Sequence, residues 1–268
     1  MEAISFVFAD RATVPGFLGV DVQREVVEQI LQLQADRVLL ITDETVDELH
    51  SNYFRELQGV VQGETGFETN AEAPLLEKYV LPSGDAAKSW SHLSELIKWS
   101  FSIGATKKSV VVAFGGGALL NVAGLFASIC FRGMKLVYVP TTFLAMHDVV
   151  TSLKTSICFD GRKNNIGSFY APLKILIDVA FCRTLPKSEL FSGLGELAKN
   201  AALLGGEHAE GFISALSKDS IDSHNGGSGE EFSLCDTTMV QLVRLGIKAK
   251  MQVLLHDAYE KQSGMIFE

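Results

Sequence analysis

Cysteine and proline are scarce in this sequence, and several informative patterns are missing from it. The 268 residues include four cysteines and six prolines, and no CxxC pair occurs, so neither a disulfide framework nor a cysteine zinc site is indicated. Only 23 Lys and Arg stand against 32 Asp and Glu, which argues against a nucleic-acid partner. Without a run of about 18 apolar residues or a signal-peptide pattern in residues 1–20, we expect a cytoplasmic protein with no membrane partner.

Short apolar runs separated by helical patterns predict the fold class. The runs that read as buried strands are RVLLIT (37–42), SVVVAF (109–114), MKLVYVP (134–140) and KILIDV (174–179). Such strands, alternating with helices such as the one expected over residues 22–34, indicate a parallel sheet covered on both faces. The remaining chain is helical in pattern, except for a polar, glycine- and serine-rich stretch at 217–231 that predicts a loop. We predict a Rossmann-like α/β domain over residues 1–180 and the beginning of an all-α domain over 181–268.

A glycine run at the end of the second strand predicts an anion-binding turn. In VVVAFGGGALLNVAG (110–124) the strand runs through Gly115, Gly116 and Gly117 directly into a helix. Backbone amides at such a turn, together with the helix dipole, favour a pyrophosphate. The spacing is not GxGxxG, so the ordinary dinucleotide-binding fold is not implied, and a tight turn without a ligand is equally compatible with three glycines.

Three further side chains are candidates for the same nucleotide. Asp43 follows the strand 37–42, where an acid can accept hydrogen bonds from ribose hydroxyls. Asp85 and Lys88 lie in PSGDAAKS (82–89), a turn ahead of a helix. Each of them, taken alone, fits a loop or a helix cap better than a ligand.

Polar residues concentrate in two later segments. The stretch 140–172 follows a buried strand and carries Asp148, Lys154 and the run Arg-Lys-Asn-Asn at 162–165; cations and amides there suit a phosphorylated, polyhydroxylated substrate. The alternative is a solvated loop. In GLGELAKNAA (193–202), Glu196, Lys199 and Asn200 share one side of an otherwise apolar helix.

These motifs together resemble the sugar phosphate cyclases, the family of 3-dehydroquinate synthase and 2-deoxy-scyllo-inosose synthase. The motifs that carry the resemblance are FGGGALLNVAG, FRGMKLVYVPTTFLAMHD, SLKTS, GRKNNIGSFYAP, LIDVAFCRTLP and SGLGELAKN, in this order. The resemblance implies an N-terminal domain that binds NAD and a helical domain that holds a divalent metal, cobalt or zinc. It also implies a homodimer and a small-molecule sugar phosphate as substrate.

Site residues follow from the resemblance, position by position. Matched to NAD contacts are Asp43, Asp85, Lys88, Gly115, Gly116, Gly117, Asn121, Thr141, Thr142, Lys154, Lys163 and Asn164. Matched to substrate and catalytic positions are Asp148, Lys154, Lys199, Asn200 and Lys250. Glu196 matches the metal-binding carboxylate. In the reaction this implies, bound NAD transiently oxidises a substrate hydroxyl, phosphate leaves, hydride returns, and an intramolecular aldol step closes a carbocycle.

The subfamily is indicated by a few positions. Asn121, SLKTS and the tail YEKQSGMIFE resemble the inosose synthases, whose substrate is glucose 6-phosphate, whereas Cys158 departs from both groups. The alternatives are dehydroquinate synthase, a sedoheptulose 7-phosphate cyclase, a metal-dependent polyol dehydrogenase, or an inactive paralogue. The family's two metal-binding histidines have no counterpart before Glu268, so we expect a truncated cyclase with little or no activity as residues 1–268 alone.

Overall fold

The fold was analysed in a computed structural model that describes residues 1–8, 13–61, 74–217 and 234–254. Apart from its first residue, the predicted loop at 217–231 lies outside the described residues. The tail YEKQSGMIFE, His224 and His256 lie outside them too.

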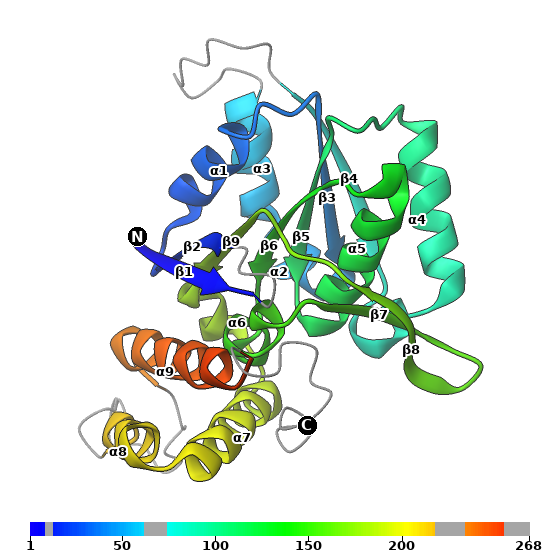
Figure 1. The fold of residues 1–268 in the computed structure, drawn as a ribbon. Helices are drawn as coiled ribbons and strands as arrows, with labels where there is room; N and C mark the ends of the chain where they lie inside the picture. The colour runs from blue at the N-terminus through cyan, green and yellow to red at the C-terminus, as the bar shows by residue number, and fades with distance from the viewer. Residues whose placement is uncertain (9–12, 62–73, 218–233, 255–268) are drawn as a thin grey trace.

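A seven-stranded sheet forms the centre of the α/β part (Figure 1). Across the sheet its strands are β1 (Glu2–Val7), β2 (Thr13–Gly19), β9 (Lys174–Asp178), β6 (Lys135–Pro140), β5 (Val110–Gly115), β3 (Arg37–Asp43) and β4 (Leu75–Leu81). Every neighbouring pair is parallel except β1 and β2, which are antiparallel. The four predicted strands (β3, β5, β6 and β9) and their parallel pairing are therefore confirmed. Three strands that were not predicted, β1, β2 and β4, complete the sheet, and β1 is its antiparallel edge strand.

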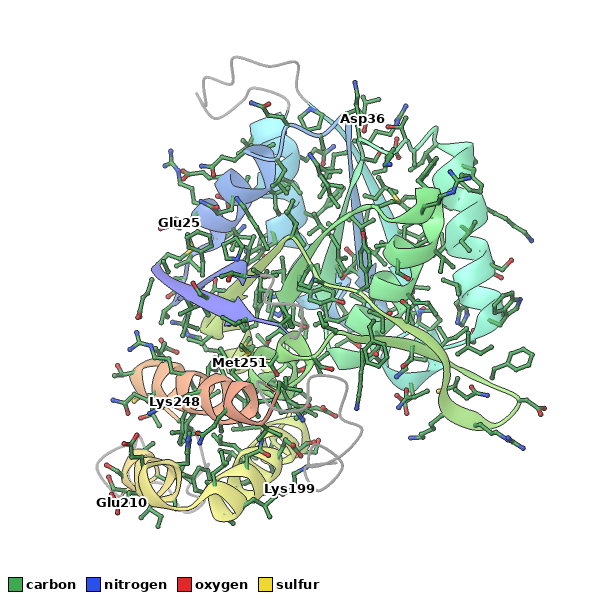
Figure 2. The ribbon with its side chains drawn as sticks, viewed as in Figure 1. Glu25, Asp36, Lys199, Glu210, Lys248 and Met251 are labelled. Carbon is green, nitrogen blue, oxygen red and sulfur yellow. The ribbon has the colours of Figure 1, made fainter. Side chains whose placement is uncertain are left out.

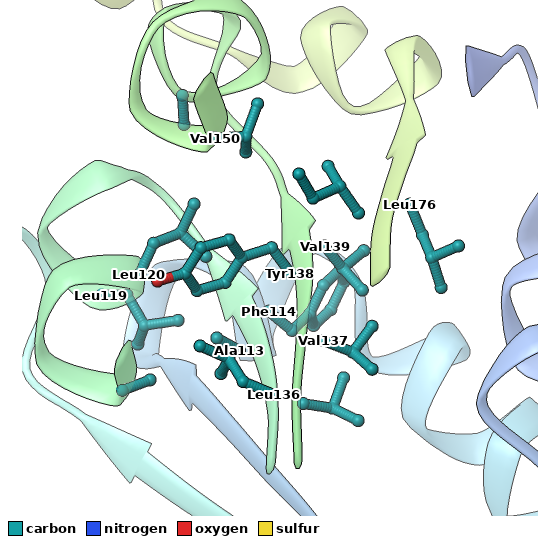
Figure 3. Close-up of a cluster of buried hydrophobic side chains, with 14 of the residues drawn as sticks. Ala113, Phe114, Leu119, Leu120, Leu136, Val137, Tyr138, Val139, Val150 and Leu176 are labelled. Atoms are coloured by element: carbon teal, nitrogen blue, oxygen red, sulfur yellow. The ribbon is translucent and has the colours of Figure 1, made fainter. Parts of the chain in front are cut away.

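Helices cover both faces of this sheet, which is why its inner strands are apolar along their whole length. On one side lie α1 (Gln23–Leu31) and α3 (Ser51–Val61), and on the other α4 (Trp90–Ser102) and α5 (Gly117–Ile129) (Figure 1). Helix α1 ends three residues earlier than predicted. Figure 3 shows Leu119 and Leu120 of α5 in the same buried cluster as Tyr138 of β6.

The stretch 140–172 folds into regular structure and is not a loop, although its polar run at 162–165 is exposed to solvent. It contains the short helix α6 (Phe143–His147), a 3₁₀ turn (Val149–Thr151) and an antiparallel hairpin, β7 (Lys154–Phe159) and β8 (Arg162–Phe169). The hairpin packs on α5, where a Cβ on Gly124 would lie 2.5 Å from Thr155 Cγ2. Its turn residues have positive φ, 53° and 71°, as an Asp-Gly hairpin turn requires.

The remaining helices lie beyond the carboxyl ends of the parallel strands (Figure 1). They are a 3₁₀ segment (Val179–Thr184), α7 (Lys187–Leu204), α8 (Gly206–Ala215) and α9 (Asp236–Leu254). The prediction of helices after the last strand is confirmed, while the domain boundary at residue 180 stays a prediction. Helix α6 contacts both α7 and α9. None of the helices that the structure describes is both long and apolar enough to pass through a bilayer.

Candidate functional site

The glycine loop joins β5 to the amino-terminal end of α5, as predicted. Gly116 is the N-cap residue of α5, and no side chain caps the helix, so its first amides can take a ligand's oxygens instead. A Cβ on Gly116 would lie 3.0 Å from Thr142 Cγ2, and one on Gly117 would lie 3.1 Å from Val149 Cγ2. Side chains at these two positions would fill the space through which a pyrophosphate reaches the helix end.

Asp43 lies beside this loop and also caps a helix. It is the last residue of β3, and its carboxylate accepts a hydrogen bond from Val46 N at 3.0 Å at the start of α2 (Glu44–Leu49). The same carboxylate accepts from Ser83 Oγ at 3.2 Å, and its Oδ2 would lie 3.1 Å from a Cβ on Gly115. The helix-cap interpretation is therefore correct for Asp43, and its position next to Gly115 agrees with the ribose-acid prediction too.

The two threonines lie on the opposite side of the glycine loop. Thr141 N donates to the carbonyl oxygen of Gly115 at 3.0 Å, and Thr142 caps α6 through its side chain. Thr141 is 4% exposed, and its hydroxyl has no hydrogen-bond partner among the described residues. A buried hydroxyl without a partner costs free energy, and a ligand beside the loop would supply the missing acceptor.

The hairpin and the turn before α4 form the third wall of this region. Lys88 Nζ donates to Asn164 Oδ1, and Lys163 Nζ pairs with Asp85 Oδ2 at 3.0 Å. Burial lowers the pKa of Lys88, although Cys158 and Asp85 oppose that change in part. The hydrogen bond to Asp85 raises the pKa of Lys163. Asp85 and Lys88, which the resemblance matched to NAD contacts, therefore contact Lys163 and Asn164, which it matched to the same ligand.

Ser156 connects this wall to α5, although no role was predicted for it. Its hydroxyl lies 3.2 Å from Asn121 Oδ1 and 3.1 Å from Asn164 Oδ1, while Asn121 Nδ2 donates to the Gly117 carbonyl at 2.9 Å. Ser156 belongs to the motif SLKTS, which was the available signal. Its partners could not be identified without knowing that β7 crosses α5.

A second group of polar residues lies where α6, α7 and α9 meet. Lys250 Nζ on α9 lies 3.0 Å from Asp148 Oδ1, and the lysine side chain is 6% exposed. Lys154 is half-buried at the start of β7, with its amide donating to Ser152 Oγ at 3.1 Å. The structure thus joins Asp148 to Lys250. Lys154 stands at the opposite end of β7 from Cys158, whose backbone N–H donates to the Lys88 carbonyl oxygen at 2.8 Å.

Helix α7 contributes the polar edge predicted from GLGELAKNAA. Glu196 and Lys199 form an ion pair of 2.8 Å one turn apart, and Figure 2 shows Lys199 on α7. Asn200 is 1% exposed, and neither atom of its amide group has a hydrogen-bond partner among the described residues. An unsatisfied buried amide marks a place where a polar ligand or water would be stabilising.

The described residues fit a dinucleotide better than they fit a metal ion. The uncapped helix end, the glycine cradle and the unpaired Thr141 hydroxyl all suit a pyrophosphate-containing ligand. By contrast, no three His, Cys, Asp or Glu side chains gather into a metal-binding group within the described ranges. Glu196 supplies one carboxylate, and three protein ligands are typical of zinc-type sites.

Known proteins resemble this arrangement over most of the chain. A family profile described as 3-dehydroquinate synthase N-terminal matches residues 78–192. The 2-deoxy-scyllo-inosose synthase of Streptomyces kanamyceticus is 34% identical over 99% of this chain, and that of Streptomyces fradiae is 36% identical over 96%. The chain is similar to the sugar phosphate cyclases over nearly its whole length. Its resemblance to that family, predicted from the ordered motifs, is confirmed.

A solved cyclase structure agrees with the fold. The crystal structure of a 2-deoxy-scyllo-inosose synthase complexed with carbaglucose-6-phosphate, NAD+ and Co2+ superposes with a TM-score of 0.80 at 29% identity, covering all of this chain and 67% of that one. The predicted fold class, an α/β part followed by an incomplete helical part, is thereby confirmed. The present chain spans 62% of the length of the Streptomyces kanamyceticus relative and 54% of that from Streptomyces fradiae.

Proposed function

We propose that this chain is the NAD-binding part, with part of the helical domain, of a cyclase that converts glucose 6-phosphate to a carbocycle with loss of phosphate. One observation carries the proposal. Segments far apart in the sequence gather around the uncapped end of α5, namely Asp43, Thr142, the Asp85–Lys88 turn and the hairpin residues Lys163 and Asn164. The relatives named 2-deoxy-scyllo-inosose synthase support the substrate class.

Each wall of the nucleotide site has a distinct task in this proposal. Amides at the start of α5 hold the pyrophosphate, and Asp43 accepts hydrogen bonds from ribose hydroxyls. Lys88 and Lys163 compensate negative charge on the nucleotide, and Asn121 and Ser156 fix Asn164 in place. When bound, NAD supplies the acceptor for a hydride from the substrate carbon.

The helical side of the site binds the sugar phosphate in this proposal. Lys250 and Lys154 compensate the phosphate charge, and Asp148 orients Lys250 through their ion pair. Asn200 offers an amide to a substrate hydroxyl. Glu196 is proposed as one ligand of a cobalt or zinc ion, beside Lys199. Within the described residues no group of three potential metal ligands forms around Glu196, so this part of the chain alone is not expected to hold the ion in a fixed geometry.

Binding and turnover test different parts of this proposal. Calorimetric titration of the purified chain with NAD should show saturable binding, which a Gly116→Val variant should lose because its side chain would press against Thr142. Phosphate release should then be measured with glucose 6-phosphate, in the presence of NAD and cobalt or zinc, on residues 1–268 and on a chain extended to the length of the relatives. We expect turnover only with the extended chain. Absence of NAD binding by residues 1–268 would contradict the proposal.

Four alternatives are separated by phosphate release, NADH accumulation and NAD binding. A 3-dehydroquinate synthase, which the matching family profile favours, or a sedoheptulose 7-phosphate cyclase would release phosphate from its own seven-carbon sugar phosphate and not from glucose 6-phosphate. A polyol dehydrogenase would accumulate NADH, whereas a cyclase regenerates NAD in each turnover. NAD binding without turnover by the extended chain would favour an inactive paralogue.

The proposed assembly is a cytoplasmic homodimer, with domains meeting near residue 180. Light scattering after size-exclusion chromatography should give twice the chain mass of 29.1 kDa. Limited proteolysis should cut near residue 180 before it cuts within the sheet. A monomeric mass at micromolar concentration would contradict the dimer while leaving the NAD site untested by that measurement.

A further inference from the structure

Two glycines hold the short helix α6 between the longer helices α7 and α9. A Cβ on Gly193 of α7 would lie 2.5 Å from Phe143 Cδ1 and 2.9 Å from Leu144 N. A Cβ on Gly246 of α9 would lie 2.7 Å from both Cβ and Cγ of His147. All of these distances are far below van der Waals contact. Each long helix therefore approaches α6 closely only because it carries glycine at the point of contact.

His147 is the side chain that enters the space left by Gly246. It is fully buried, and its ring lies edge-to-face against Phe143 with a centroid distance of 4.7 Å. The residue after it is Asp148, the C-cap of α6. Lys250 follows Gly246 by four residues, so both face the same side of α9. Asp148 is the next residue after His147, and Lys250 is about one helical turn after Gly246. The Gly246–His147 contact therefore lies directly beside the 3.0 Å Asp148–Lys250 pair.

We propose that Gly246 and His147 are positioning residues, whose contact sets the distance between Asp148 and Lys250. The importance of that pair for catalysis rests on the proposed function, but the positioning itself does not. His147 Cβ and Cγ are the first atoms of the side chain and cannot swing away from a new methyl group. Helix α9 would have to move outward by about 1 Å to restore contact distance, enough to bring a 3.0 Å ion pair near the limit of about 4 Å.

Chemical acetylation of lysines, followed residue by residue with mass spectrometry, tests this positioning without NAD or sugar. The readout is the rate at Lys250, 5% exposed, relative to the rate at Lys88, 8% exposed at the nucleotide end of the fold. Gly246→Ala should raise the Lys250 rate about tenfold or more and leave Lys88 unchanged, because only the α6–α9 contact opens. Gly195→Ala is the matched control, since a Cβ on that exposed residue of α7 meets nothing within 4 Å; both rates should keep their original values.

A compensating variant distinguishes positioning from general packing. Adding His147→Gly to Gly246→Ala removes all the His147 atoms that the new methyl group would strike, so protection of Lys250 should return in part. The proposal is wrong if Lys250 stays protected in Gly246→Ala, or if the double variant restores nothing. It is also wrong if Lys88 and Lys250 become reactive together, because the change is then a general loss of structure. A failure of the unaltered chain to bind NAD would contradict only the proposed function and not this positioning.

Discussion

At the scale of single residues, Lys88 is the clearest test of the proposed nucleotide site. Its side chain is buried and its ammonium group donates to Asn164 at the edge of the hairpin. Lys88→Met should weaken NAD binding by about 10- to 100-fold, since a charged hydrogen bond contributes about 1.5–3 kcal/mol. Calorimetry measures the affinity. Lys135→Met is the control, because Lys135 lies at the amino-terminal end of β6, away from the glycine loop, and donates to Leu33 O at 3.1 Å. Equal losses in both variants would contradict the assignment.

His147 makes a prediction about stability and pH. Burial lowers its pKa from 6.5 to about 4, although the Asp148 carboxylate opposes this in part. Between pH 6.5 and about pH 4 the unfolded chain binds more protons at His147 than the folded chain does. The free energy of unfolding therefore falls as the pH falls through this range. From pH 7 to pH 5 the contribution lost is about 2 kcal/mol. Urea unfolding at both pH values measures it.

The control for this prediction is a variant that does not titrate. His147→Asn should be less stable at pH 7, but its free energy of unfolding should fall less between pH 7 and pH 5 than that of the unaltered chain. Burial also lowers the pKa of His50, which contributes to the pH dependence of both proteins equally. The same pH dependence in both would show that His147 does not titrate in this range on unfolding.

At the scale of elements, Asp178 joins three segments at the end of β9. Its carboxylate accepts from Asp21 N, Val22 N and Ala180 N, each at 3.0 Å, and from the Tyr53 hydroxyl on α3. Asp178→Ala should lower the free energy of unfolding by about 3 kcal/mol or more, because several donors lose their acceptor at once. Tyr53→Phe removes one donor and should cost about 1 kcal/mol. Urea unfolding measures both, and equal effects of the two changes would contradict this account.

The elements also show how far the sequence predicts the fold. The inner strands were predictable because burial on both faces makes runs such as SVVVAF continuously apolar. The hairpin was not predictable, because its second strand, RKNNIGSF, is mostly polar and exposed to solvent. No apolar run marks it as a strand. Asp160-Gly161 was a usable turn signal between its strands. Strands β1, β2 and β4 were missed as well. The edge strands β1 and β4 are short and partly exposed, and β2 contains a proline and glycines, which are uncommon within strands.

The candidate site, like the fold, was predictable from the sequence only in part. The glycine loop was predictable, since a strand, three glycines and a helix must place amides at one end of the sheet. Lys88, Asn164, Asp148 and Lys250 were each matched to a site position by resemblance to a family. The contacts Lys88–Asn164 and Asp148–Lys250 could not be predicted, because they depend on how distant parts of the chain pack together. Ser156 and Gly246 show the limit most clearly. A hydroxyl on a strand and a glycine within a helix acquire their meaning only from what packs against them.

At the scale of the whole molecule, NAD binding should stabilise one part of the chain more than the other. A ligand that binds only the folded state adds about 2.7 kcal/mol at a concentration 100 times its dissociation constant. The proposed nucleotide site is built from the ends of β3, β5 and β6 together with the hairpin, whereas α8 packs against α7 and α9. Hydrogen exchange of the purified chain with and without saturating NAD should therefore slow in α5 and the hairpin and remain unchanged in α8. A Gly116→Val variant should show no slowing anywhere. Uniform slowing that reaches α8 would mean that the sheet and the helices open as one cooperative unit, and the boundary predicted at residue 180 would then be wrong.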